Sequence, residues 1–270
     1  TGAHVVYGVV GYKTHAKMLM VVRREGGVLR RYVHLSTGNY HARTTKVYTD
    51  FGLLTSNEQI CADVNDVFTQ LTGLGKASKL KHLWQSPFTL HRQLLRAIQN
   101  ETAHVAAGRK GRIIAKMNAL LEPLVIAALY EASKAGVEID LIVRGVCALR
   151  PGLPGVSDNI RVRSLVGRFL EHTRVFYFHA GGSDDVYLSS ADWMPRNLFR
   201  RVEVCFPVFD AKLKKRIIAE GLMPYLQDNT QAWQMDADGA YRLLTPDAAE
   251  AMGAQQLLIE QLSQAQAQPT

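Results

Sequence analysis

The chain has 270 residues, of which 47% are hydrophobic and 21% are charged. These values are ordinary for a globular protein and exclude a disordered chain. No apolar stretch reaches the ~18 residues of a membrane-spanning helix, and the first residues lack the basic start and apolar core of a signal peptide. Cys61, Cys147 and Cys205 are too widely spaced for a disulfide framework or a metal knuckle. We therefore expect a cytoplasmic protein with three ordinary thiols.

The formal net charge of +8 is concentrated in the first part of the chain. Residues 1–120 hold 17 Lys and Arg against 6 Asp and Glu, whereas residues 231–270 hold 1 against 5. Such a basic excess favours a polyanion as partner or substrate, although a solvated basic face is an equally ordinary explanation. Aromatic residues do not alternate with the basic ones as they do in single-strand grooves, and we expect no nucleic acid partner.

The first part of the chain predicts strands followed by one helix. An apolar run at Val5–Val10 predicts a buried strand. The segments 15–22 and 28–35, on either side of a Glu-Gly-Gly turn, predict a hairpin. Apolar residues then recur at helical spacing over 60–71, after a capping residue at Ser56. Residues 74–88 are irregular and basic, so we place a domain boundary near residue 82.

The second part alternates helices and strands. A strand–helix–strand order, with Pro123 in the first turn of its helix, predicts a parallel pair of strands. We expect helices at 90–107, 123–135 and 211–225 and strands at 112–117, 138–143, 160–165, 174–179, 186–190 and 201–206. The last forty residues are acidic and rich in Gln and Ala, which predicts a marginal helix or a frayed tail.

Each half of the chain carries a histidine motif. The two motifs are His15-Ala16-Lys17 followed by Ser36-Thr37-Gly38-Asn39, and His172-Thr173-Arg174 followed by Ser189-Ser190-Ala191-Asp192 and Asn197. Alternate residues of a strand share a face, so each histidine is expected beside a fixed cation. This arrangement suits phosphate, because the imidazole can attack phosphorus while the cation and the N–H groups of the turn hold its oxygens. A single motif is usually structural, but two copies favour one nucleophile facing one general acid or base.

The duplicated motif resembles the phospholipase D superfamily, and longer words point to one branch of it. The words VHLSTGNY, TxxYTDFGLLT, KMNALLEPxVIxALYEAS and LIVRGVCALRPGLPG resemble the C-terminal part of the polyphosphate kinase family. The resemblance covers about residues 5–235. It implies an α/β fold that leans toward α+β, with two phospholipase D-like units whose mixed sheets pack around a shared cleft. Residues 1–82 would be part of the first unit, 83–232 the second, and 233–270 an acidic tail or helix.

The resemblance also implies a reaction. Members of the family reversibly transfer the terminal phosphoryl group of ATP to inorganic polyphosphate through a phosphohistidine. By resemblance, His15 is the phosphorylated nucleophile and His172 is the opposing acid or base near the bridging oxygen of ATP. Tyr48, Arg144 and His172 match positions that contact the nucleotide, so ATP and ADP are the expected substrates.

The remaining site positions are expected to handle phosphate. Lys17 and Arg174 would screen phosphoryl charge, and Asn39 and Asn197 would orient side chains or contact oxygens. Arg174 stands where the superfamily has lysine, which keeps the charge but presents a planar fork. Arg92, Lys116 and Arg150 are further candidates for polyphosphate contacts.

Members of the family are longer than this chain, and their upstream regions supply part of the nucleotide pocket and the surroundings of Mg²⁺. We therefore expect Mg²⁺ to be held mainly outside this chain and assign no metal ligand here. Members also tend to form homo-oligomers and to associate loosely with the inner face of the membrane. Two alternatives stay open, namely a phosphodiesterase or transferase of the phospholipase D superfamily, and a polyanion-binding fragment that is inactive without its upstream domains.

Overall fold

The computed structural model describes residues 2–73, 79–246 and 250–267, and in these ranges the chain forms a ten-stranded mixed sheet and a separate three-stranded sheet. The large sheet has the order β1-β13-β12-β11-β7-β8-β9-β14-β15, with β6 paired to β13. Its strands are β1 (Lys13–Thr14), β6 (Trp84–Ser86), β7 (Arg112–Met117), β8 (Glu138–Val143), β9 (Ile160–Leu165), β11 (Val175–Phe178), β12 (Asp185–Ser189), β13 (Arg201–Pro207), β14 (Ala232–Met235) and β15 (Tyr241–Leu243). The α/β class with mixed sheets is therefore confirmed.

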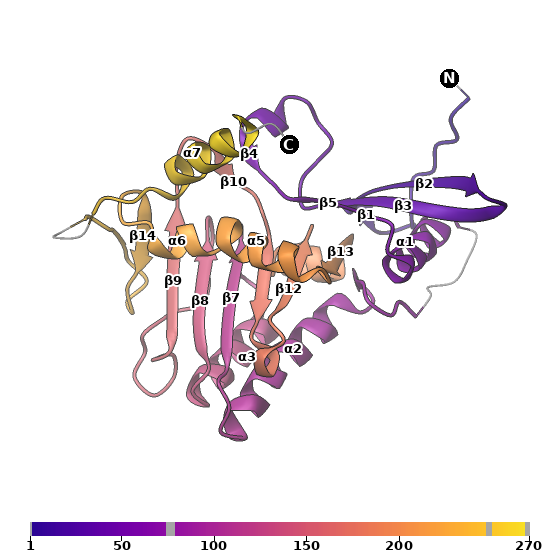
Figure 1. Cartoon of the computed structure of the whole chain (residues 1–270). Helices are drawn as coiled ribbons and strands as arrows, with labels where there is room; N and C mark the ends of the chain where they lie inside the picture. The colour runs from indigo at the N-terminus through magenta and orange to yellow at the C-terminus, as the bar shows by residue number, and fades with distance from the viewer. Residues whose placement is uncertain (1, 74–78, 247–249, 268–270) are drawn as a thin grey trace.

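Helices cover both faces of the large sheet (Figure 1). One face packs against α2 (Leu90–Ala106) and α3 (Pro123–Lys134), and the other against α5 (Ala211–Gly221) and α6 (Met223–Gln227). The predicted helix over 211–225 is thus two helices, because Pro224 has no N–H with which to continue the hydrogen-bond ladder. The short helix α4 (Pro195–Phe199) precedes β13, and α7 (Ala254–Ala267) lies above the upper end of the sheet in Figure 1.

The three-stranded sheet belongs to the first part of the chain. It consists of β2 (Lys17–Glu25), β3 (Val28–Ser36) and β5 (Gly52–Thr55), and the β2–β3 hairpin projects to the right in Figure 1. Helix α1 (Glu58–Leu71) packs on one face, and its cap is Asn57, one residue beyond the predicted Ser56. Between β3 and β5 the chain forms a 3-10 turn at Thr44–Lys46 and the short strand β4 (Tyr48–Thr49), which pairs with β10 (Leu170–Glu171).

Two sequence predictions differ from the structure at the ends of the chain. Val5–Val10 is not a strand, because among the described residues no neighbouring strand completes its hydrogen bonds. Val5, Val6 and Val10 are exposed, and only Val9 packs against a hydrophobic cluster. At the other end, α7 agrees with the predicted tail or helix over 233–270, but the segment also contains most of β14 and all of β15. Residues 74–78 of the predicted irregular segment lie outside the described residues.

The two halves of the chain repeat one order of elements. Three antiparallel strands followed by a helix occur first as β2-β3-β5-α1 and again as β11-β12-β13-α5. The turns match in detail, since the hydroxyl of Ser36 accepts from Gly38 N–H and that of Ser189 accepts from Ala191 N–H. The repeat predicted from the histidine motifs therefore extends to the backbone around them.

Two further predictions concern the whole chain. The three cysteines are free thiols, with Cys61 and Cys205 buried and Cys147 half-buried, as expected. Over the described ranges, none of the helices combines the length and apolar character that crossing a bilayer requires. The predicted domain division near residue 82 stays a prediction.

Candidate active site

Two short parallel strand pairs place each histidine opposite a carboxylate. In the β1–β13 pair Thr14 lies opposite Val202, so the next residues in register are His15 and Glu203. In the β10–β4 pair Glu171 lies opposite Thr49, so the next residues are His172 and Asp50. Each half of the chain therefore supplies the carboxylate that pairs with the histidine of the other half.

In the first pair, the buried carboxylate of Glu203 fixes the ring of His15. His15 Nδ1 is 2.8 Å from Glu203 Oε2, and Glu203 also accepts from Ser190 Oγ at 2.5 Å and from Asn197 Nδ2 at 2.7 Å. An ionised carboxylate only accepts hydrogen bonds, so His15 carries its proton on Nδ1 and keeps a lone pair on Nε2. Lys17 Nζ lies 2.9 Å from that Nε2. This geometry presents a nucleophilic nitrogen beside an ammonium group.

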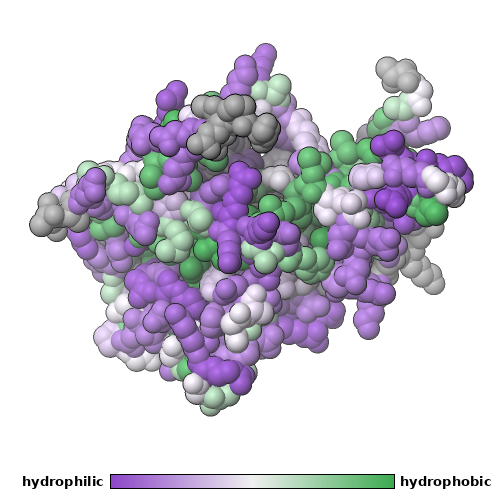
Figure 2. All heavy atoms as spheres, in the orientation of Figure 1, coloured by the Kyte–Doolittle hydropathy of each residue, from purple (hydrophilic) through white to green (hydrophobic). Residues whose placement is uncertain are grey.

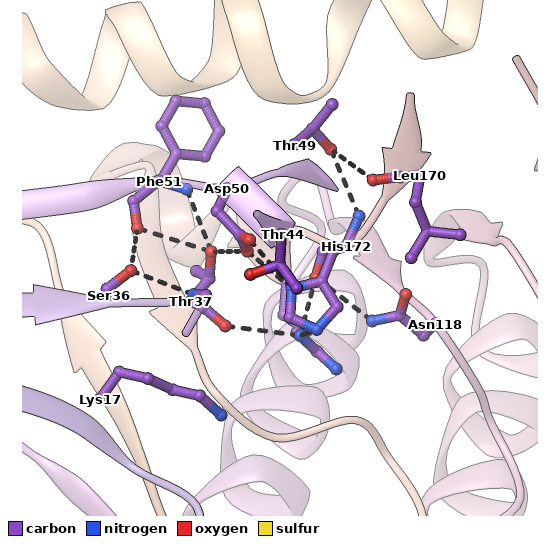
Figure 3. A network of polar contacts seen from close by, with 12 residues as sticks. Lys17, Ser36, Thr37, Thr44, Thr49, Asp50, Phe51, Asn118, Leu170 and His172 are labelled. Carbon is purple, nitrogen blue, oxygen red and sulfur yellow. Dashed lines mark hydrogen bonds and ion pairs between the residues drawn. The ribbon is translucent and has the colours of Figure 1, made fainter. Parts of the chain in front are cut away.

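The His172 pair has the same plan. His172 Nδ1 is 2.8 Å from Asp50 Oδ1, to which Thr37 Oγ1 donates at 2.7 Å (Figure 3). Arg174 Nη1 lies 3.0 Å from His172 Nε2, so a cation again faces the free ring nitrogen. Burial lowers the pKa of His172 below its ordinary value, the nearby Arg174 lowers it further, and Asp50 opposes the shift. The ring is therefore neutral near pH 7 in the free protein.

A contact places Arg174 of the second motif beside the turn of the first. Arg174 Nη1 reaches the carbonyl of Thr37 at 3.5 Å, and Figure 3 shows Lys17 extending toward the network around Thr37 and His172. Burial lowers the pKa of Lys17 to about 8, with Arg174 adding to the shift and Glu203 and Asp50 opposing it. Lys17 and Arg174 thus lie within electrostatic reach of each other, as a site for a phosphate chain requires.

The predicted nucleotide residues both lie beside His172. The ring of Tyr48 is 5.2 Å from the ring of His172, centroid to centroid. Arg144 Nε donates to the carbonyl of Glu171 at 2.9 Å and to Asn118 Oδ1 at 3.0 Å. The structure therefore groups Tyr48, Arg144 and His172, and their contact with a nucleotide stays a prediction.

The remaining predicted residues occupy three different settings. Asn39 is exposed, and the matching turns make Asp192, not Asn197, its counterpart in the second half. Asn197 is buried beneath His15 through its bond to Glu203. Lys116 is 2% exposed and ion-paired to Glu171 at 2.6 Å, so the predicted polyphosphate contact is wrong. A lysine enclosed in this way has no surface to offer a polymer.

Comparisons with known proteins identify the family. The family model described as "Polyphosphate kinase C-terminal domain 1" matches residues 1–77, and "Polyphosphate kinase C-terminal domain 2" matches residues 83–255. The chain belongs to the polyphosphate kinase family. It is 66% identical to a polyphosphate kinase of Burkholderia cenocepacia and 65% identical to one of Paraburkholderia phytofirmans, covering 89% and 91% of this chain. In each case the match spans 36% of the relative, so the chain is about a third of the length of these proteins.

A solved structure agrees with this assignment. The crystal structure of polyphosphate kinase from Porphyromonas gingivalis superposes with a TM-score of 0.89 at 37% sequence identity. The superposition covers 95% of this chain and 40% of that chain. The fold that carries the two histidine motifs is therefore shared with that polyphosphate kinase.

Sequence reasoning about this polyphosphate kinase segment missed the acidic partners of the site. Asp50 and Glu203 each lie thirteen residues after the hydroxyl that bonds them, Thr37 and Ser190 respectively. That common spacing is visible in the sequence and repeats in both halves. Asp192 belongs to the second motif, but the sequence assigned it no role; it holds Arg174 through two bonds and accepts from the backbone N–H of Asn118.

Lys17→Arg is expected to remove a pH dependence from phosphate binding. Because the pKa of Lys17 is lowered to about 8, the wild-type side chain loses its charge as the pH rises through that value. A bound anion raises this pKa, so the affinity for tripolyphosphate should fall by about tenfold for each pH unit above it. Arginine stays charged throughout, and the variant should show no such fall.

Isothermal titration at pH 7, 8 and 9 and constant ionic strength measures this difference. The ligand's own titration acts on both proteins and cancels in the comparison. Wild-type and variant curves that run in parallel from pH 7 to 9 would show that Lys17 does not contact the phosphate chain.

Proposed function

We propose that the chain is the catalytic C-terminal part of a polyphosphate kinase, which reversibly transfers the γ-phosphoryl group of ATP to inorganic polyphosphate. The two histidine–carboxylate pairs carry this proposal. In each, Nδ1 bonds the carboxylate and Nε2 faces a cation, which is Lys17 at His15 and Arg174 at His172. Membership of the family supplies the reaction. The geometry supports a nucleophile and a second imidazole at one phosphate-binding site.

In the proposed first step, His15 Nε2 attacks the γ-phosphorus of ATP. The bond from phosphorus to the β–γ bridging oxygen breaks, ADP leaves, and the phosphoryl group remains on Nε2. Glu203 stabilises the positive charge that develops on the ring through the Nδ1 proton, and Lys17 turns from Nε2 to a phosphoryl oxygen. In the second step the terminal oxygen of polyphosphate attacks the same phosphorus, the Nε2–phosphorus bond breaks, and neutral His15 is restored as the chain grows by one unit.

His172 is proposed to act on the bridging oxygen. Its ring is neutral in the free protein, and the negative charge of bound phosphates raises its pKa, so the protonated form is taken up with the nucleotide. Asp50 fixes the orientation of the ring through Nδ1. The proton on Nε2 then neutralises the leaving oxygen of ADP, and Arg174 disperses the remaining charge.

Mg²⁺ is proposed to arrive with ATP and to have its protein ligands outside this chain. No cluster of three or more His, Cys, Asp or Glu side chains in the described parts of the chain is arranged to hold a metal. Asp50 and Glu203 direct their oxygens to histidine, hydroxyl and amide donors. These residues do not fit a magnesium site, so the steps above use only side chains of this chain.

A chimaera tests the proposed function. In it, this chain replaces the matching 36% of the Burkholderia cenocepacia polyphosphate kinase. We expect the chimaera to make polyphosphate from ATP and to take an acid-labile label from [γ-³²P]ATP. A phosphodiesterase would instead hydrolyse bis(p-nitrophenyl) phosphate and take no label. Binding of polyphosphate without any turnover, in the chimaera as well as in the isolated chain, would favour a polyanion-binding fragment.

The three-stranded sheet has an exposed apolar face, which suggests that residues outside this segment cover it. Leu19 lies four residues after His15 and is 49% exposed, whereas Phe176, four residues after His172, is 1% exposed beneath α2 and α3. Leu54 on the same open face is 80% exposed, and Figure 2 shows hydrophobic residues gathered beside this sheet. Among the described residues β2 has one neighbouring strand, while its counterpart β11 has two. We propose that the rest of a polyphosphate kinase chain covers this face; homo-oligomers and membrane association are implied by the family alone.

Leu54→Ser distinguishes a covered face from a free one. In the isolated chain the exposed leucine contributes little, and we expect a change in the free energy of unfolding of about 0.5 kcal/mol or less. In the chimaera, burial of the same side chain should raise the loss to about 1–2 kcal/mol. Urea unfolding measures both values, and Leu29→Ser, at the exposed hairpin, is the matched control. Equal losses in the two proteins would show that nothing covers this face.

A further inference from the structure

The first turn of α7 contacts β10, the strand that directly precedes His172. Gln255 is 4% exposed, and its amide pairs with both backbone groups of Phe169, accepting from the N–H at 3.0 Å and donating to the carbonyl at 2.9 Å. The same Nε2 donates to Glu171 Oε1 at 2.6 Å. The side chain of Gln255 therefore forms the hydrogen bonds that a neighbouring strand would form with the backbone just before β10.

Glu171 connects this amide to the rest of the site. Its carboxylate accepts from Gln255, from Lys116 at 2.6 Å and from Thr49 Oγ1 at 2.8 Å. Burial opposes ionisation, but Lys116 and the hydrogen bonds outweigh it and hold the pKa of Glu171 below its ordinary value. Glu171 and Thr49 directly precede His172 and Asp50. The bond between their side chains therefore fixes the two strand ends from which the pair projects.

The two half-sites differ in how their strands are supported. The β1–β13 pair beneath His15 is part of the ten-stranded sheet. The β10–β4 pair beneath His172 is a separate sheet with two residues in each strand, which is marginal without other support. Side-chain bonds from β7 and α7 supply that support at Glu171. The start of α7 is itself fixed, because the buried Asp228 accepts from Ala254 N–H at 2.7 Å.

We propose that Gln255 is a positioning residue that sets the orientation of His172 toward the reacting phosphates, so that α7 is part of the catalytic unit. This inference rests on the proposed function for its effect on rate, but its structural half can be tested without turnover. Gln255→Met keeps the volume and removes all three hydrogen bonds. The neighbouring Gln256→Met is the matched control, since Gln256 is exposed and bonds only Glu260 of the same helix.

The structural test uses the 270-residue chain and the histidine ring signals in proton–carbon NMR spectra. In Gln255→Met we expect the His172 signals to shift and the pKa of His172 to rise toward its ordinary value as the ring becomes less enclosed. The charged groups that face this ring are Asp50, Arg174 and Asp192, and all three remain in the variant. The His15 ring signals should stay at their wild-type positions, as should every ring signal in Gln256→Met.

The kinetic test uses the chimaera. Misplacement of a reacting group by about 1 Å costs about a hundredfold in rate, so we expect kcat of Gln255→Met to fall by about 10- to 100-fold with KM for ATP within about twofold. Gln255→Asn keeps an amide one methylene further back and should lose less. If the methionine variant fails to fold by circular dichroism, the asparagine variant still allows both readouts.

The outcomes separate this inference from the proposed function. If the wild-type chimaera makes no polyphosphate, the function fails, and the NMR comparison alone decides the role of Gln255. Unchanged His172 signals in the folded variant would overturn the positioning role. An equal loss of kcat in Gln255→Met and Gln256→Met would do the same, because only one of the two glutamines reaches β10.

Discussion

Replacing His15 with alanine is expected to abolish labelling of the chimaera by [γ-³²P]ATP and to lower polyphosphate synthesis by about 10⁴-fold or more. Removal of a nucleophile leaves only the binding and electrostatic contributions of the site, which explains a loss of this size. The label should be stable in alkali and lost in acid, as a phosphoramidate is. The measurement is ³²P retained on the protein after gel filtration, followed by quantification of polymer.

The control is His41→Ala, which removes an exposed histidine from the same part of the chain. It should label and turn over like the wild type. His172→Ala should still accept label, more slowly, because the proton for the leaving ADP is lost while the nucleophile remains. A protein that labels normally without His15 but not without His172 would show that the two roles are reversed.

Local pattern was sufficient for most elements of the second half. The structure places α2, β7, α3 and β8 within one or two residues of the predicted bounds, and β7 and β8 are parallel as expected. These elements are long, strongly periodic and bounded by turn residues or Pro123. Val5–Val10 shows the limit of the same reasoning, because an apolar run becomes a strand only where another strand can pair with it.

The site could be predicted only in part for a similar reason. Both histidines and their cations lie within single motifs, so the sequence indicates them directly. Their carboxylates lie 188 and 122 residues away, and only the register of β1–β13 and β10–β4 brings them together. No local pattern encodes that register.

The two repeats depend on each other, because each supplies the carboxylate that bonds the histidine of the other. Neither histidine has its acidic partner within its own repeat, so separating the repeats would leave both imidazoles without a fixed tautomer. Glu203 is the more enclosed of the two supports, because it is fully buried and lies in β13, which pairs with β1, β6 and β12 of the large sheet. The geometry of the His15 ring is therefore set by a buried carboxylate of the large sheet.

Glu203→Gln is expected to lower the rate of His15 phosphorylation by about 10³- to 10⁴-fold, the loss that follows when a catalytic imidazole takes the wrong tautomer. The amide oxygen can still accept from Asn197 at the Oε1 position. The amide nitrogen then stands where Oε2 accepted from His15 and Ser190, so donors face donors. His15 escapes this conflict by carrying its proton on Nε2, which removes the lone pair that attacks phosphorus.

Nitrogen-15 spectra of the His15 ring report the tautomer directly, and rapid-quench labelling of the chimaera reports the rate. The mispaired donors should also lower the free energy of unfolding by about 1–3 kcal/mol. Ser190→Ala removes one donor to Glu203 and leaves the carboxylate, so it should keep the wild-type tautomer and lose at most about tenfold in rate. A glutamine variant in which His15 holds its proton on Nδ1 and that labels as fast as wild type would show that Glu203 does not prepare the nucleophile.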